Sequence, residues 1–159
     1  MTVNNIFYST KNQFSRKNHS FTVKSNKEIP VINIMPLLCK VKSREPEVLL
    51  FIHGEGSIIE TDINVFSSFF EKHLFRKDPF KLFIDLRKVE NASMNLVQTL
   101  AAKMIGYEEH TPGKVLATSI LVNSFMIESL VNLLFQLKPP STPTKITSDI
   151  NIACDFINQ

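Results

Sequence analysis

The sequence predicts an α/β fold: a mostly parallel sheet of about four to five strands with helices, in the order β-β-α-β-α-β-α-β-α, after an extended N-terminal arm. Short apolar runs rich in β-forming residues alternate with stretches whose apolar residues follow the three-four spacing of a helix. Proline or glycine separates these segments, for example at Asp78-Pro79 and at Thr111-Pro112-Gly113. The 159 residues are enough for one domain with a hydrophobic core, and too few for two of ordinary size.

The beginning of the body predicts a hairpin. Residues 30–36 are bracketed by prolines, which favours an edge strand or an extended connector. Residues 37–42 and 48–53 are apolar runs on either side of a short turn, and Gly54-Glu55-Gly56 is expected to end the second run. These two strands would start the sheet.

Two helices flank the predicted central strand. Thr61 or Asp62 is expected to cap the first helix, which stops at Asp78-Pro79. The central strand covers residues 82–86 and is followed by a helix over residues 93–108. A buried strand that leads into a crossover helix is typical of a parallel sheet.

A further strand over residues 115–122 leads to Asn123-Ser124, which predicts the N-cap of a helix over residues 125–137. That helix is apolar around most of its circumference, whereas a surface helix needs only one apolar stripe. We therefore expect a second contact surface on it.

The last elements follow a proline-rich connector over residues 138–143. Residues 144–147 predict a short strand, and Ser148 or Asp149 is expected to cap a final helix that runs through Ile157. Alternating strands and helices with short connections predict right-handed crossovers in this part of the chain.

The chain divides by charge into an arm, residues 1–29, and a body, residues 30–159. Residues 1–27 carry five Lys or Arg and no acid, while the remainder carries thirteen against fifteen acids. Such a polar segment cannot build its own core, so we expect the arm to lie along the body or along a partner. A basic start without acids is also compatible with a transit peptide. The residues predicted to bind a partner are Phe7, Tyr8, Phe14, Arg16, Lys17, Phe21 and Lys24.

Composition predicts an ordinary soluble protein of the cytoplasm, with 43% hydrophobic and 21% charged residues. Cys39 and Cys154 lie far apart and have no His or Cys at zinc spacing, which predicts reduced, buried thiols in an intracellular compartment. We predict no metal and no cofactor. The start has no signal-peptide pattern, and no apolar run reaches the roughly 18 residues that a membrane span needs.

One segment resembles a known family. Phe83-Ile84-Asp85-Leu86-Arg87-Lys88-Val89, followed by a small-residue cap and a helix, is similar to the central strand and loop of STAS domains. STAS domains form the bacterial anti-sigma-factor antagonists and the cytoplasmic tails of sulfate transporters. Residues 117–123 and 144–153 resemble the last strands and terminal helix of the family. The resemblance spans roughly residues 37–159, rests on element order and on Asp85-Leu86-x-x-Val89, and implies a STAS-like fold.

The resemblance also implies a possible phosphoacceptor. Family members that act as switches carry Asp-Ser-Ser-Gly where the next helix starts, with the phosphate at a helix N-terminus. This sequence has Asn91-Ala92-Ser93-Met94-Asn95 there, and a one-residue gap aligns Ser93 with the serine of the family. The favoured role of Ser93 is the helix cap. Asp85 is either an acid of the switch loop or, as we favour, a strand-end residue that accepts backbone hydrogen bonds.

Other chemical candidates are few. His53 and Glu55 follow a strand and are compatible with an acid–base pair or two metal ligands, although a solvated loop pair is favoured. Gly54-Glu55-Gly56 lacks the third glycine of a dinucleotide motif. His73 and His110 are expected near helix ends, where polar side chains are common.

The function predicted from the sequence is a non-enzymatic interaction or scaffold component of a larger assembly. The arm would thread onto a neighbour or an acidic surface, such as a cytoskeletal or capsid lattice. The alternative is a STAS-type switch controlled by phosphorylation near Ser93 or by a bound nucleotide or lipid. Thirteen phenylalanines also allow a small ligand in the interior, whereas nucleic-acid binding by five cations would be unspecific and is disfavoured.

Overall fold

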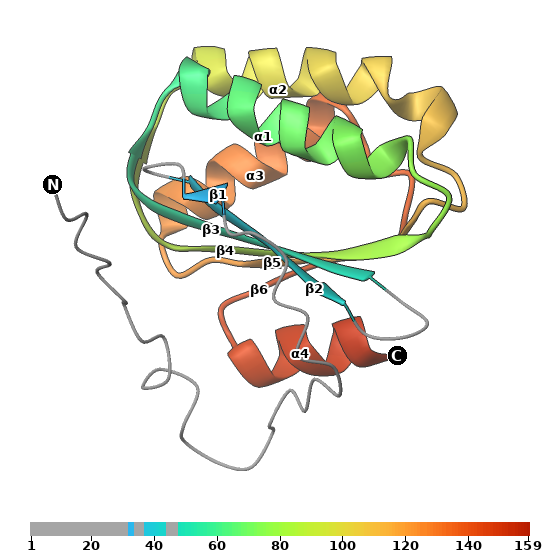
Figure 1. Cartoon of the computed structure of the whole chain (residues 1–159). Coiled ribbons are helices and arrows are strands. Elements are labelled where there is room, and N and C mark those ends of the chain that lie inside the picture. Colours follow the sequence, from blue (N-terminus) through green and yellow to red (C-terminus); the bar gives the residue numbers. More distant parts are fainter. Residues whose placement is uncertain (1–31, 34–36, 44–47) are drawn as a thin grey trace, which may run out of the picture.

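The computed structural model describes residues 32–33, 37–43 and 48–159 (Figure 1). The predicted arm and its partner-binding residues lie outside these residues. The elements, in chain order, are β1 (Ile32–Asn33), β2 (Leu37–Ser43), β3 (Val48–Ile58), α1 (Glu60–Leu74), β4 (Phe80–Ala92), α2 (Met94–Gly106), the short 3-10 helix η2 (Glu108–His110), β5 (Val115–Leu121), α3 (Phe125–Leu137), β6 (Thr144–Thr147) and α4 (Ile150–Asn158).

The strands form one sheet in the order β1-β2-β3-β4-β5-β6. Strands β1, β2 and β3 pair antiparallel, which confirms the predicted hairpin, and β3 to β6 are parallel. The predicted element order is confirmed. The proline-bracketed segment contributes β1 as an edge strand, which brings the sheet to six strands.

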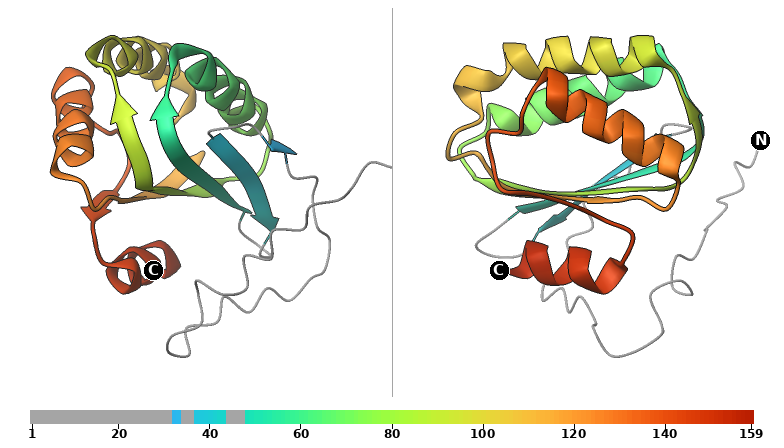
Figure 2. Two further views of the ribbon diagram at one scale, coloured as in Figure 1. Left: turned by 90° about the vertical axis from the view of Figure 1, so that its left-hand side faces the viewer. Right: turned by 180° about the vertical axis from the view of Figure 1, so that it is seen from behind.

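The helices cover the two faces of the sheet unequally. Figures 1 and 2 show α1, α2 and α3 on one face and α4 alone on the other. Right-handed crossovers that add each new strand on the same side put every intervening helix on one face. Helix α4 follows the last strand and folds back over β4, β5 and β6, where Ala153, Cys154 and Ile157 pack near Phe83 and Leu121.

Strands β3 and β4 are longer than predicted and form a two-stranded extension. The strand β3 does not end at Gly54-Glu55-Gly56 but runs to Ile58, and β4 continues from Asp85 to Ala92, beyond the last residue of β5. The glycines permit this continuation. Gly54 fits tightly against Val89, and Gly56 takes a φ of 72° where the register shifts.

The helix starts agree with the sequence except in α1. Ser93 caps α2 and Asp149 caps α4, as predicted, and Ser124 takes the N-cap position of α3. Helix α1, however, starts at Glu60 with Ile59 at the N-cap. The prediction of Thr61 or Asp62 is wrong because Asp62 acts from inside the first turn, where its carboxylate accepts a hydrogen bond from the backbone N–H of Ile59 at 2.9 Å.

The segment between α2 and β5 connects the C-terminal ends of three helices. Tyr107 donates a hydrogen bond to the Glu71 carboxylate of α1 at 2.5 Å. Lys138, just after α3, contacts Glu108 at 2.6 Å. The Lys114 ammonium donates to two backbone carbonyls just after α1, each at 2.9 Å. These contacts hold one end of the helical layer together.

Candidate functional site

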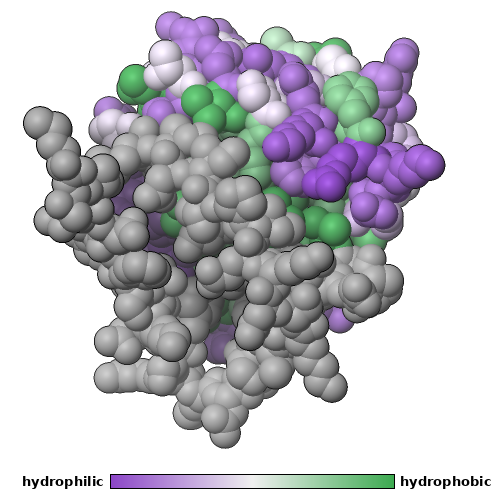
Figure 3. All heavy atoms as spheres, in the orientation of Figure 1, coloured by the Kyte–Doolittle hydropathy of each residue, from purple (hydrophilic) through white to green (hydrophobic). Residues whose placement is uncertain are grey.

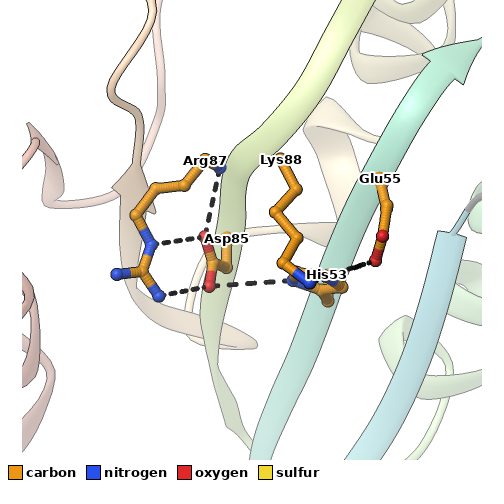
Figure 4. A network of polar contacts seen from close by, with 5 residues as sticks. All are labelled: His53, Glu55, Asp85, Arg87 and Lys88. Carbon is orange, nitrogen blue, oxygen red and sulfur yellow. Dashed lines mark hydrogen bonds and ion pairs between the residues drawn. The ribbon is translucent and has the colours of Figure 1, made fainter. Parts of the chain in front are cut away.

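Five polar side chains gather where β3 and β4 run on past β5 (Figure 4). His53 and Glu55 come from β3, and Asp85, Arg87 and Lys88 come from β4. The parallel register sets His53 beside Asp85 and, after a one-residue shift, Glu55 beside Lys88. The polar cluster therefore brings together three residues that the sequence singled out and two that it did not.

Asp85 and Arg87 form the centre of this cluster. Asp85 is only 4% exposed, and its carboxylate accepts hydrogen bonds from the backbone N–H, Nε and Nη2 of Arg87 at 3.1, 3.0 and 2.8 Å. Burial raises the pKa of Asp85, but the nearby His53 and the hydrogen bonds from Arg87 outweigh burial and hold that pKa well below its usual range. Asp85 thus accepts a backbone hydrogen bond as predicted, although it lies within β4 and not at its end.

His53 lies between two carboxylates. Its Nδ1 is 3.7 Å from Oδ2 of Asp85, and its Nε2 is 3.5 Å from Oε2 of Glu55. Lys88 approaches the same Glu55 oxygen at 3.5 Å, and the Glu55 side chain is 62% exposed. The two contacts of Glu55 are long and solvated, so they contribute little energy. Within the described part of the chain, no three His, Cys, Asp or Glu side chains are placed to hold a metal ion.

Ser93 lies at the end of the β3–β4 extension, exposed and directly before α2. Its hydroxyl oxygen accepts a hydrogen bond from the backbone N–H of Leu96 at 3.2 Å, which is the contact of an N-cap. The first turn of α2 has no acidic side chain. An exposed hydroxyl therefore lies at a helix N-terminus whose partial positive charge is not neutralised by an acidic side chain in the first turn.

Helices α2 and α3 share an outward surface with few charges. Among their residues only Lys103 of α2 and Glu128 of α3 are charged, whereas α1 carries Glu60 and Asp62 in its first turn and Lys72 in its last. Figure 3 shows hydrophilic residues gathered over the C-terminal end of α1. We call the outward side of α2 and α3 the charge-poor face. Its exposed large apolar residues are Met94, Ile105, Phe125, Met126 and Leu137.

The apolar circumference of α3 divides into a packed and an exposed part. Leu134 is buried with Val97 and Ala101 of α2, and Leu130 and Leu133 pack against them. Phe125 is 86% exposed at the start of the helix. Packing on α2 thus buries much of the apolar surface of α3 that the sequence predicted to form a second contact. The rest of this apolar surface is exposed at the two ends of α3.

The remaining sequence candidates are separate from the cluster. His73 is buried in the core, where its Nδ1 donates to the Phe69 carbonyl at 2.8 Å, while His110 is exposed beside Phe75. His73 lies in the last turn of α1, near a helix end as predicted, but its ring points inward to the core. Cys39 and Cys154 are both buried, and burial raises the pKa of the Cys39 thiol to about 11.

The sequence alone could not have brought the cluster together. In the sequence, Arg87 and Lys88 stand out only as members of the segment that resembles STAS domains. Their contacts in the cluster depend on the register between β3 and β4. The two-residue spacing of Asp85 and Arg87, which puts both on one side of a strand, is the signal that could have identified their pair. No helix in the described part of the chain is long and apolar enough to cross a membrane.

Neither protein-family models nor curated protein sequences match the chain. Solved structures do. An uncharacterized protein of the DUF3478 family with a SpoIIAA-like fold, from Shewanella loihica PV-4, is similar with a TM-score of 0.53 and 13% identity, over 76% of this chain and 93% of that one. An anti-sigma factor antagonist from Mycobacterium paratuberculosis has a TM-score of 0.49 and 15% identity, over 77% and 95%. The first similarity shows that this chain has a SpoIIAA-like, STAS-like fold.

Proposed function

We propose that this protein is a non-enzymatic interaction component, a scaffold part of a larger assembly, and that its body binds other proteins through the charge-poor face. The exposed Phe125, Met126 and Leu137 carry the proposal. Protein interfaces are depleted in charged residues and enriched in aromatic residues and methionine, which matches the composition of this face. Its few charges also make it a poor surface for phosphates or lipid headgroups.

The polar cluster supports a role without catalysis. Asp85 is paired with Arg87, and His53 lies between the carboxylates of Asp85 and Glu55. These contacts stabilise the start of the β3–β4 extension. We propose a reducing compartment such as the cytoplasm, because the two cysteines lie far apart in the sequence and are both buried.

The basic arm would make the second contact of the scaffold. Residues 1–27 carry five positive charges and no negative ones, so an acidic surface, such as that of a cytoskeletal or capsid lattice, would attract them. Cross-linking mass spectrometry in native extract tests this role, with the full chain compared to a chain that lacks residues 1–27. Reproducible links from Lys11, Lys17 or Lys24 to a few assembly proteins, lost on truncation, are expected. Links from the arm only to its own body, with both forms behaving as free monomers, would contradict the proposal.

A second candidate function is a regulatory switch at Ser93. The exposed hydroxyl at the N-terminus of α2 supports it, because backbone N–H groups at a helix start stabilise a phosphate. A bound nucleotide or lipid could act in place of the phosphate. Mass spectrometry of the protein purified from its native source would find phosphate on Ser93 in this case. A consistently unmodified Ser93 under all growth conditions would leave the scaffold role.

A further inference from the structure

We propose that the charge-poor face binds the N-terminal arm of a neighbouring copy, so that the chains link head to tail. This inference rests on the proposed scaffold function and names the occupant of its docking face. Apart from Glu128, the exposed residues of the face are neutral, and the arm carries aromatic residues among Asn, Ser, Thr and five cations. Contacts between methionine and aromatic rings are favourable, and Met94 and Met126 are exposed on the face.

The shape of the face favours a long, thin occupant. The left panel of Figure 2 shows α1, α2 and α3 arranged in an arc, so that α2 and α3 face outward in different directions. A flat partner surface could not lie along the outward sides of both helices in this arc. An extended arm, as the sequence predicts, can follow this arc, as segments that order on binding do.

The arm is long enough to cross the face. Each helix has 13 residues and is therefore about 20 Å long. The stretch from Phe7 to Phe21 reaches about 50 Å when extended, so its aromatic side chains can span both helices. Glu128 is the one carboxylate of α3 and is exposed, which gives a cation of the arm one ionic partner.

The position of the arm favours a neighbouring copy over its own body. Residue 31 joins the arm to β1, which is one edge of the sheet, whereas α3 packs over β4, β5 and β6 toward the opposite edge. Docking on its own α3 would require the arm to pass around the molecule. Docking on a neighbour leaves the arm free to depart from the edge, and such a head-to-tail contact repeats from copy to copy.

Sedimentation of the full-length protein tests the proposal. We expect the wild-type mass to rise with concentration to at least twice the 18.1 kDa of one chain. A chain with Phe7, Phe14 and Phe21 changed to Ser, and a chain with Phe125→Ser and Met126→Ser, should each remain at the mass of one chain. An equimolar mixture should form dimers and nothing larger, because it pairs one intact arm with one intact face.

A matched variant and a second measurement control the test. Ile152→Ser removes an exposed apolar side chain from α4, on the other face of the sheet, and should assemble like wild type. Circular dichroism checks that each variant is folded. A wild-type chain that stays at the mass of one chain at every concentration overturns the proposal, as do face variants that assemble normally. Cross-links of the arm to other proteins would then persist and leave the scaffold function standing.

Discussion

Gly54 lies directly against Val89, so close that a β-carbon on residue 54 would sit 2.7 Å from Cγ2 of Val89. Leu86 and Ile58 border the same space at 3.3 and 3.4 Å. The branched side chain of valine cannot swing away as a long, flexible one can. The absence of a side chain at this position therefore allows β3 and β4 to remain paired beyond the end of β5.

Changing Gly54 to Ala should lower the free energy of unfolding by about 1–3 kcal/mol, the usual cost of overpacking. Urea unfolding measures the change. Gly106→Ala is the matched control, because nothing lies within 4 Å of a β-carbon there and alanine is the better helix former by about 1 kcal/mol. Equal effects of the two substitutions would show that the contact with Val89 does not constrain residue 54.

Asp85→Asn should destabilise the protein by about 2 kcal/mol at pH 7, less than for a fully buried pair because a third of the Arg87 side chain is exposed. The folded pKa of Asp85 is lowered, so its stabilisation is present above the unfolded pKa of about 3.9 and is lost as the pH falls. The difference between wild type and variant in urea unfolding should therefore shrink below about pH 4. Glu55→Gln, at a solvated site, should change stability by less than about 0.5 kcal/mol.

Low pH should lower the folding stability of the protein through protonation of His73. Burial lowers the pKa of this histidine, although its hydrogen bond to the Phe69 carbonyl acts the other way. A neutral His73 therefore contributes stability above the unfolded pKa of about 6.5, and that stability is lost as the pH falls through the lower folded pKa. Thermal unfolding between pH 8 and pH 5 should show a steeper fall of the melting temperature in wild type than in His73→Gln. His110→Gln, at an exposed ring, should follow wild type, and an identical slope in all three proteins would contradict this role.

Ser93→Ala should cost about 1 kcal/mol, because the N-cap hydrogen bond to the Leu96 N–H is lost. Ser124 provides the control. It occupies the N-cap of α3 without a side-chain hydrogen bond to the helix, so Ser124→Ala should have a smaller effect. Guanidinium unfolding compares the two. If the two variants lose the same stability, the Ser93 hydroxyl does not act as a cap.

Most of the fold could be predicted from local patterns. The hairpin, the three crossover helices and the caps at Ser93 and Asp149 follow from apolar spacing and polar helix-start residues. The extension of β3 beyond Gly54 could not, because glycine alone is a turn signal. In this protein the close contact between Gly54 and Val89, which lies 35 positions later, determines that β3 continues past the glycine.

The candidate sites were harder to predict. The cluster around Asp85 depends on the register of two parallel strands, and the position of His73 depends on which side of α1 faces the sheet. The sequence shows that α3 has more apolar residues than one buried stripe needs. It does not show how many of them α2 covers. The partner-binding role of the arm stays a prediction.

The placement of α4 has a consequence for synthesis. This last helix packs on the face of the sheet opposite the other three, beside Leu49, Phe83 and Leu121. The ribosome releases residues 150–158 after every strand of the sheet, so the nascent chain lacks this cover until the final helix arrives. Exposed apolar surface of that kind promotes aggregation of folding intermediates. This face of the sheet thus gains the cover of α4 only after every strand has been made, and a chain stalled before Ile150 would depend on chaperones.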